Sequence, residues 1–193
     1  YLNAGDGRFT EIAWLAGVHA TDWTWAVLFG DLDQDGWTDA YVTNGMFRDF
    51  MNSDAIMRIS RMRSTRGNVV WKRQPELREA NLALRNTGDL GFVDRADDWG
   101  LAHTGITFGA ALADLDRDGD LDVIASEYEG TPLLYRNDQA AGNSLLVSLR
   151  GNGPNTFGIG ARVTARLPGD PRPVTRELAL ARGIASGQEP LVH

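Results

Sequence analysis

The sequence has no cysteine and only three histidines among its 193 residues. The lack of cysteine excludes disulfide scaffolds, thiolate zinc sites and cysteine nucleophiles, although it leaves the cellular compartment open. The histidines, His19, His103 and His193, are scattered without the spacing of a His-Glu-x-x-His metal site, and no Gly-x-Ser-x-Gly elbow occurs. The sequence therefore predicts no catalytic residue and favours a protein that is not an enzyme.

Long apolar segments are also missing. No run approaches the roughly 20 residues that cross a bilayer, and no export signal is present in the sequence. The chain opens on Tyr1-Leu2-Asn3, in the middle of a pattern that recurs later. We therefore expect that the native N-terminus lies upstream, together with any export signal.

Positively charged residues are also fewer than negatively charged ones. The chain carries 19 Lys and Arg against 26 Asp and Glu, which gives a net charge of −7 and a pI of about 4.9. Binding to a phosphate backbone needs clustered cations, so we do not expect nucleic acid as a partner. An acidic chain is instead suited to holding hard divalent cations.

What the sequence does contain is a repeat at an offset of 83 residues, the distance from Asp31 to Asp114. Residues 3–9 pair with 86–92 through shared Asn, Gly and Phe, and residues 31–39 pair with 114–122 without a gap. In each copy, one short apolar run precedes an acidic loop and another follows it. Such runs, bounded by Gly and Asp, suit buried strands.

These patterns predict a mainly β protein, built from partial propeller blades with a helical insert and followed by a small, incomplete β domain. In the repeats, strands are expected at 25–29, 40–43, 108–112, 123–126 and 132–136. In the tail they are expected at 143–150, 161–167 and 174–180. The predicted domains are a first repeat at 1–46, an insert at 47–83, a second repeat at 84–141 and the tail domain at 142–193.

The insert is expected to contain a basic helix that ends near Arg63. Its candidate N-caps are Asn52, Ser53 and Asp54, and its apolar face would be formed by Ile56, Met57, Ile59 and Met62. Basic residues are dense between Arg58 and Arg73, but the aromatic interleaving of the insert, from Phe50 and Trp71, is too thin to favour nucleic-acid binding. We favour a solvated helix packed over one end of the repeats; the alternative is a docking patch for an acidic partner.

The acidic loops carry Asp at positions 1, 3, 5 and 9. These residues are Asp31, Asp33, Asp35 and Asp39 in the first loop, and Asp114, Asp116, Asp118 and Asp122 in the second. Alternate residues of a tightly curled loop point to one centre, where four carboxylates repel one another unless a cation neutralises them. Gly36 and Gly119 at position 6 permit the sharp turn, and the backbone carbonyls of Trp37 and Asp120 at position 7 are expected to add a ligand. Oxygen-only ligands suit Ca²⁺, so the sequence predicts two calcium sites.

Three alternatives to calcium loops fit the sequence less well. An EF-hand requires Glu at position 12 and flanking helices, whereas Val42 and Ala125 stand there in apolar, β-rich segments. Magnesium is less suited because it demands a stricter octahedron. Metal-free surface turns are disfavoured by two copies in register. A metal in these loops is expected to be structural, since each loop ties two strands together.

The residues around the second loop resemble a known repeat. Phe108-Gly109-Ala110, followed by residues 113–123, is similar to an FG-GAP or VCBS repeat, the blade unit of integrin-α-like propellers. The tail resembles the ASPIC/UnbV domain at 158–163, 176–178, 186–188 and 191–193. Val42-Thr43-Asn44-Gly45 with Arg48-Asp49-Phe50 is similar to bacterial members of the cartilage acidic protein family, which join these two parts.

The resemblance implies a seven-bladed propeller in the intact protein, calcium in the blade loops, and an extracellular or periplasmic location. Only two clear repeats are present, so this chain alone cannot close a ring. The tail stops where the family continues with a Phe-Gly-Leu-Gly run, which implies that the last domain is incomplete. The open edge that results invites association.

Two classes of function remain. The first is a non-catalytic module for adhesion or for binding a protein or glycan, in which calcium rigidifies the binding loops. The second is part of an enzyme that acts on polysaccharide or a secondary metabolite. Its best candidates are Glu127 and Glu129, which alternate along one strand end, although a solvated strand end is the simpler interpretation. For a glycan-binding role, Trp23 and Trp25 are the aromatic pair to examine.

Overall fold

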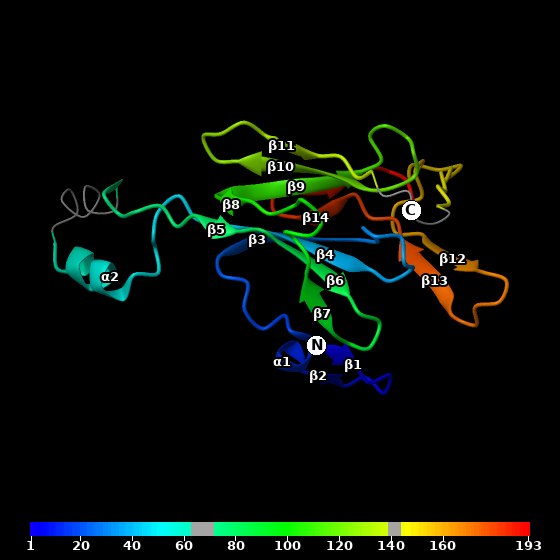
Figure 1. Cartoon of the computed structure of the whole chain (residues 1–193), viewed down its shortest axis with the longest axis horizontal. Helices are drawn as coiled ribbons and strands as arrows, with labels where there is room; N and C mark the ends of the chain where they lie inside the picture. Colours follow the sequence, from blue (N-terminus) through cyan, green and yellow to red (C-terminus); the bar gives the residue numbers. More distant parts are fainter. Residues whose placement is uncertain (63–71, 139–143) are drawn as a thin grey trace.

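The computed structural model describes residues 1–62, 72–138 and 144–193 and confirms a mainly β fold, with 36% strand and 7% helix. Its largest sheet has nine strands in the order β11-β10-β9-β15-β14-β3-β4-β6-β7 and curls into a half-barrel (Figure 1). These strands are β3 (Thr24–Gly30), β4 (Asp39–Asn44), β6 (Leu82–Asn86), β7 (Phe92–Asp94), β9 (Thr107–Ala113), β10 (Asp122–Glu127), β11 (Leu133–Tyr135), β14 (Ala181–Gly183) and β15 (Ser186–Gln188). The remaining elements are β1 (Leu2–Asn3), β2 (Phe9–Thr10), α1 (Ala13–Ala16), α2 (Ser53–Ser60), β5 (Glu79–Ala80), β8 (Thr104–Gly105), β12 (Arg162–Arg166) and β13 (Pro173–Glu177).

Two antiparallel meanders make up most of the sheet. β3, β4, β6 and β7 form the first, and β9, β10 and β11 form the second. The strands keep the 83-residue offset of the sequence repeat. The bounds of β3 and β9 are 83 residues apart, and so are those of β4 and β10. The strands predicted in the repeats are therefore confirmed, with bounds that differ by no more than two residues.

The tail contributes two strands to the same sheet. β14 pairs with β3, and β15 runs parallel to β9, so the β14–β15 hairpin lies between the innermost strands of the two meanders (Figure 1). The β12–β13 hairpin forms a separate two-stranded sheet. Part of the predicted tail domain is thus built into the repeats, and the boundary near residue 142 stays a prediction.

The main core joins the two meanders. Fully buried side chains from both meanders meet there, including Leu28, Tyr41, Leu112 and Val123. β4 is buried along its whole length because it lies between β3 and β6 and contributes to a core cluster on each face. The acidic loops lie where β3 and β9 end and β4 and β10 begin, so this packing positions them.

Three expectations about the tail and insert are wrong in detail. Residues 144–150 do not form a strand, because Val147 finds a partner only in Val192, as an isolated bridge. The insert's helix, capped by the Asn52 side chain, ends at Ser60 rather than near Arg63. This helix, α2, projects beyond the end of the sheet instead of packing over it (Figure 1). Predictions that fall on residues 63–71 and 139–143 lie outside the described residues.

Neither described helix approaches the length and apolar character that a membrane crossing would require.

Candidate metal centre

The two acidic loops lie between equivalent strands and have similar backbone conformations. The first joins β3 to β4 and the second joins β9 to β10. Gln34 and Arg117 at position 4 have positive φ angles of 56° and 64°, and Gly36 and Gly119 at position 6 have φ of 89° and 102°. Residues other than glycine rarely adopt positive φ angles. The glycine at position 6 therefore has the conformational role that the sequence predicted.

The Asp at position 1 closes each loop. Asp31 Oδ2 accepts the backbone N–H of Gly36 at 2.9 Å, and Asp114 Oδ2 accepts that of Gly119 at 3.1 Å. The remaining carboxylates converge only in part. One oxygen from each member lies within 4.8 Å of the others in two groups, Asp31 with Asp33 and Asp39, and Asp114 with Asp116 and Asp118. The structure thus brings six of the eight predicted carboxylate ligands into compact clusters.

The Asp at position 9 serves the backbone as well. Asp39 is fully buried, and its oxygens accept the N–H groups of Leu32 at 2.9 Å and Asn86 at 2.8 Å. Asp122 does the same with Leu115 and Asn137, both at 2.8 Å. Burial raises the pKa of Asp39 to about 6, against the lowering effect of the two backbone N–H groups. These two residues tie each loop to the next strand of its meander.

Position 7 differs between the loops. Trp37 lies under Arg172, whose guanidinium is 4.7 Å from the ring centroid, whereas Asp120 adds a fifth carboxylate to the second loop. The Asp120 side chain is buried, and burial raises its pKa to about 7, helped by hydrogen bonding and repulsion from Asp118. The sequence predicted only a backbone ligand at this position, and the side chain was missed.

Two arginines approach the first loop from distant parts of the chain. Arg85, at the end of β6, donates from Nε to Asp33 at 2.5 Å and from Nη2 to Asp35 at 2.6 Å. Arg176, on β13, donates from Nη2 to Asp31 at 3.2 Å. Burial raises the pKa of Asp31, and the Arg176 charge opposes that increase. Neither arginine was predicted as a partner of the loop, although a recurring Arg-Asn pair at 85–86 and 136–137 marks the position of Arg85.

The second loop has fewer compensating charges. Arg136, the counterpart of Arg85, lies 4.0 Å from Asp116 and makes its shorter contact, 2.8 Å, with Asp138. The buried atoms Asp114 Oδ1 and Asp120 Oδ1 accept no hydrogen bond from the described residues. Buried carboxylate oxygens are costly unless they are paired or coordinate a metal. The second loop therefore fits a hard cation.

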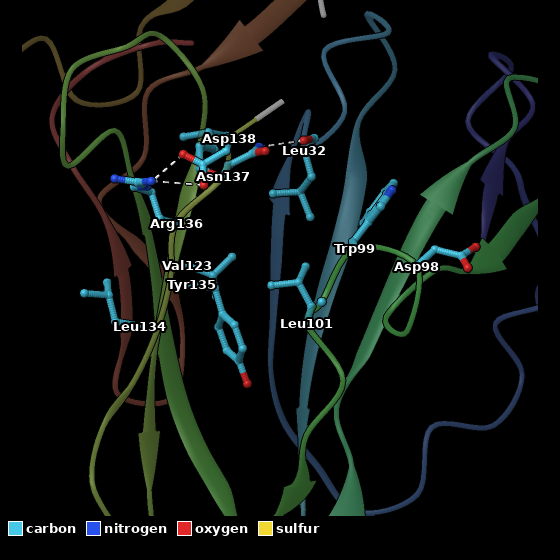
Figure 2. Close-up of a pocket in the computed structure, with 12 residues that line it drawn as sticks. Leu32, Asp98, Trp99, Leu101, Val123, Leu134, Tyr135, Arg136, Asn137 and Asp138 are labelled. Atoms are coloured by element: carbon cyan, nitrogen blue, oxygen red, sulfur yellow. Dashed lines mark hydrogen bonds and ion pairs between the residues drawn. The ribbon is translucent and has the colours of Figure 1, made fainter. Parts of the chain in front are cut away.

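The loops are also joined to each other. Gln34 Nε2 donates to the Gly119 carbonyl at 3.1 Å. Asn137, which follows β11, donates from Nδ2 to the Leu32 carbonyl at 2.9 Å, as Figure 2 shows. Since Asn137 also holds Asp122, one residue connects both loops.

A cavity of about 530 Å³ opens beside this connection, between β11 and the segment that follows β7 (Figure 2). Trp99, Leu101 and Tyr135 line its interior, and Asp98 and the Arg136–Asp138 pair lie at its rim. A second hollow of about 810 Å³ lies between the first acidic loop and the β12–β13 hairpin.

The two candidate catalytic residues do not lie on one strand. Glu127 is the last residue of β10, and Glu129 lies beyond it in a turn with φ of 52°. The Glu127 side chain is buried and accepts hydrogen bonds from His103 Nε2 at 3.0 Å and from the Ile106 N–H at 3.2 Å. Trp25 belongs to a cluster of half-buried rings with Phe108, and its indole donates to the Gly45 carbonyl. These contacts suit structural roles at the end opposite the acidic loops.

Comparison with known proteins supports the repeat. Residues 1–42 match the FG-GAP-like repeat family. The match runs from β1 into β4 and includes the whole first acidic loop, so the FG-GAP repeat predicted from the sequence is supported over this part of the chain. No curated protein matches the chain.

Proposed function

We propose that this chain is a calcium-stabilised, non-catalytic binding module of an extracellular or periplasmic propeller protein, with an ASPIC/UnbV-like tail. The FG-GAP-like match and the half-barrel of blade-like meanders support an integrin-like propeller module. FG-GAP repeats are typically extracellular, where calcium is abundant. The partner would be a protein or a glycan that contacts the loops at the ends of the blades.

The second acidic loop carries the calcium part of the proposal. Asp114, Asp116 and Asp118 would supply carboxylate oxygens, and the Asp120 carbonyl would add a backbone ligand. Buried oxygens of Asp114 and Asp120 lack a partner among the described residues, and a divalent cation with oxygen ligands would satisfy that environment. Bound there, calcium would fix the turn between β9 and β10 and lower the entropic cost of binding a partner through these loops.

Thermal unfolding in calcium and in EDTA tests this proposal. At a free calcium concentration of about 100 times Kd, one ion bound only to the native state adds roughly 2.7 kcal/mol, which corresponds to a rise in Tm of about 5–10 °C. Magnesium should give a smaller rise. Asp118→Asn should remove most of the shift, whereas Asp6→Asn, in the distant β1–β2 turn, should leave it intact. Equal Tm values in calcium and EDTA would reject calcium stabilisation.

A further inference from the structure

The two acidic loops differ in the cations that surround them. In the first loop, Arg85 bridges Asp33 and Asp35, and Arg176 bonds Asp31. Guanidinium groups thus contact three of the four carboxylates predicted to bind an ion there. Both arginines reach the loop from other elements, β6 and β13, rather than from the loop itself.

The second loop lacks an equivalent arrangement among the described residues. It carries five carboxylates, those of Asp114, Asp116, Asp118, Asp120 and Asp122. Arg136 reaches only the 4.0 Å contact with Asp116 and is itself 62% exposed. Asp114 and Asp120 are 8% and 4% exposed, and each has one oxygen without a partner in the described structure. The uncompensated negative charge is therefore concentrated in the second loop.

Arginine is well suited to stand in for a cation in the first loop. Its guanidinium is always charged and can bond two carboxylates at once in a planar fork. An incoming ion would have to displace Arg85 from two carboxylates and Arg176 from a third. Asp33 Oδ1 is also buried without a partner among the described residues, but the other oxygen of Asp33 is already bound by Arg85.

We infer that Arg85 and Arg176 neutralise the first loop, and that the chain consequently binds one divalent cation, in the second loop. This inference rests on the proposed calcium function. The first loop then docks the tail: Arg176 lies on β13, and it contacts the Gly36 carbonyl as well as Asp31. The first acidic loop, although it has the sequence of an ion-binding motif, thus serves as an attachment point for the β12–β13 hairpin.

Calcium stoichiometry, measured on the full chain by calorimetry and by native mass spectrometry, tests the inference. The wild-type chain should bind one ion, and Asp114→Asn with Asp118→Asn should bind none. The double variant Arg85→Gln with Arg176→Gln should bind two, because the first loop loses its internal cations. The matched control is Arg95→Gln with Arg162→Gln, which removes two arginines from exposed ion pairs and should still bind one.

The outcomes separate the inference from the proposed function. Two ions in the wild type would overturn the inference and leave calcium binding intact. No ion in the wild type would overturn both. A single ion in the double arginine variant, with circular dichroism showing a native fold, would show that the arginines do not block the first loop.

Terbium luminescence gives a second measurement that distinguishes the loops. Trp37 lies within the first loop, so a terbium ion bound there should be sensitised by excitation of its indole. Emission should rise severalfold in the double arginine variant relative to wild type, and adding Trp37→Phe should remove that gain. A gain that survives Trp37→Phe would place the additional ion elsewhere and overturn the inference.

Discussion

At the scale of single residues, aspartates that share a sequence motif divide into two roles. Asp39 and Asp122 bond backbone N–H groups with both oxygens. Oxygens of Asp114, Asp116 and Asp118 cluster in the second loop, whereas in the first loop Asp39 itself joins the cluster of Asp31 and Asp33. The motif alone could identify the acidic residues but not this division. The arginine partners were equally hidden, because Arg176 lies 145 residues from Asp31 in the chain.

Because Asp122, at position 9 of the second loop, accepts two backbone N–H groups, its substitution should reduce stability whether or not calcium is present. Asp122→Asn would place an amide NH₂ against a backbone N–H, leaving a buried donor unsatisfied at a cost of about 1–3 kcal/mol. Chemical denaturation should show this loss in calcium and in EDTA alike. Asp138→Asn, at an exposed ion pair, should change stability by less than about 0.5 kcal/mol. A loss seen only in calcium would instead assign Asp122 to the ion.

Buried carboxyls also predict how stability in EDTA depends on pH. The pKa of Asp39 is raised to about 6 and that of Asp120 to about 7 by burial, so the folded state favours their protonated forms. The protonated carboxyls of Asp39 and Asp120 add to the free energy of unfolding below about pH 4, and this contribution is lost as pH rises through 6 to 7. Tm should therefore fall over this interval, and Asp120→Asn should make the fall shallower. Identical pH profiles for the variant and wild type would contradict this assignment.

At the scale of elements, the repeat was predictable because its signals are local. Apolar runs and acidic loops at a fixed offset were enough to place β3, β4, β9 and β10. The position of β14 and β15 was not predictable, because it depends on contacts such as Ala110 with Ser186, 76 residues apart. The alternation at 143–150 suggested a strand, but alternation does not supply a neighbouring strand with which to pair.

The β14–β15 hairpin predicts a sensitive site on β9. A Cβ at Gly109 would overlap the Ala185 carbonyl oxygen in the turn between β14 and β15. Gly109→Ala should therefore displace the hairpin and destabilise the fold by about 1–3 kcal/mol, detectable as a lower Tm and faster proteolysis between 181 and 188. Gly153→Ala, where a Cβ meets open space, should match wild type. If both variants resist protease equally, the hairpin is not held against Gly109.

At the scale of the whole molecule, the curled sheet has two free edges within the described structure, β11 and β7. Leu134 on β11 is 64% exposed, and exposed apolar edge strands promote pairing between chains. Concentration-dependent association should occur and should be weakened by Leu134→Lys, which analytical ultracentrifugation would detect. Leu15→Lys, at a similarly exposed site in α1, should not change it. A wild-type chain that stays monomeric at high concentration would show that the edges are protected.

The β14–β15 hairpin has a consequence for the order of folding. The innermost strands of the two meanders are held together by residues 181–188, which a ribosome makes long after β3 and β9. Each meander can form from neighbouring residues as it emerges, but the sheet between them closes only after this late segment arrives. Long-range closure of this kind is slow and leaves strand edges exposed in the interval. The nascent chain is thus most vulnerable to aggregation during the synthesis of its tail.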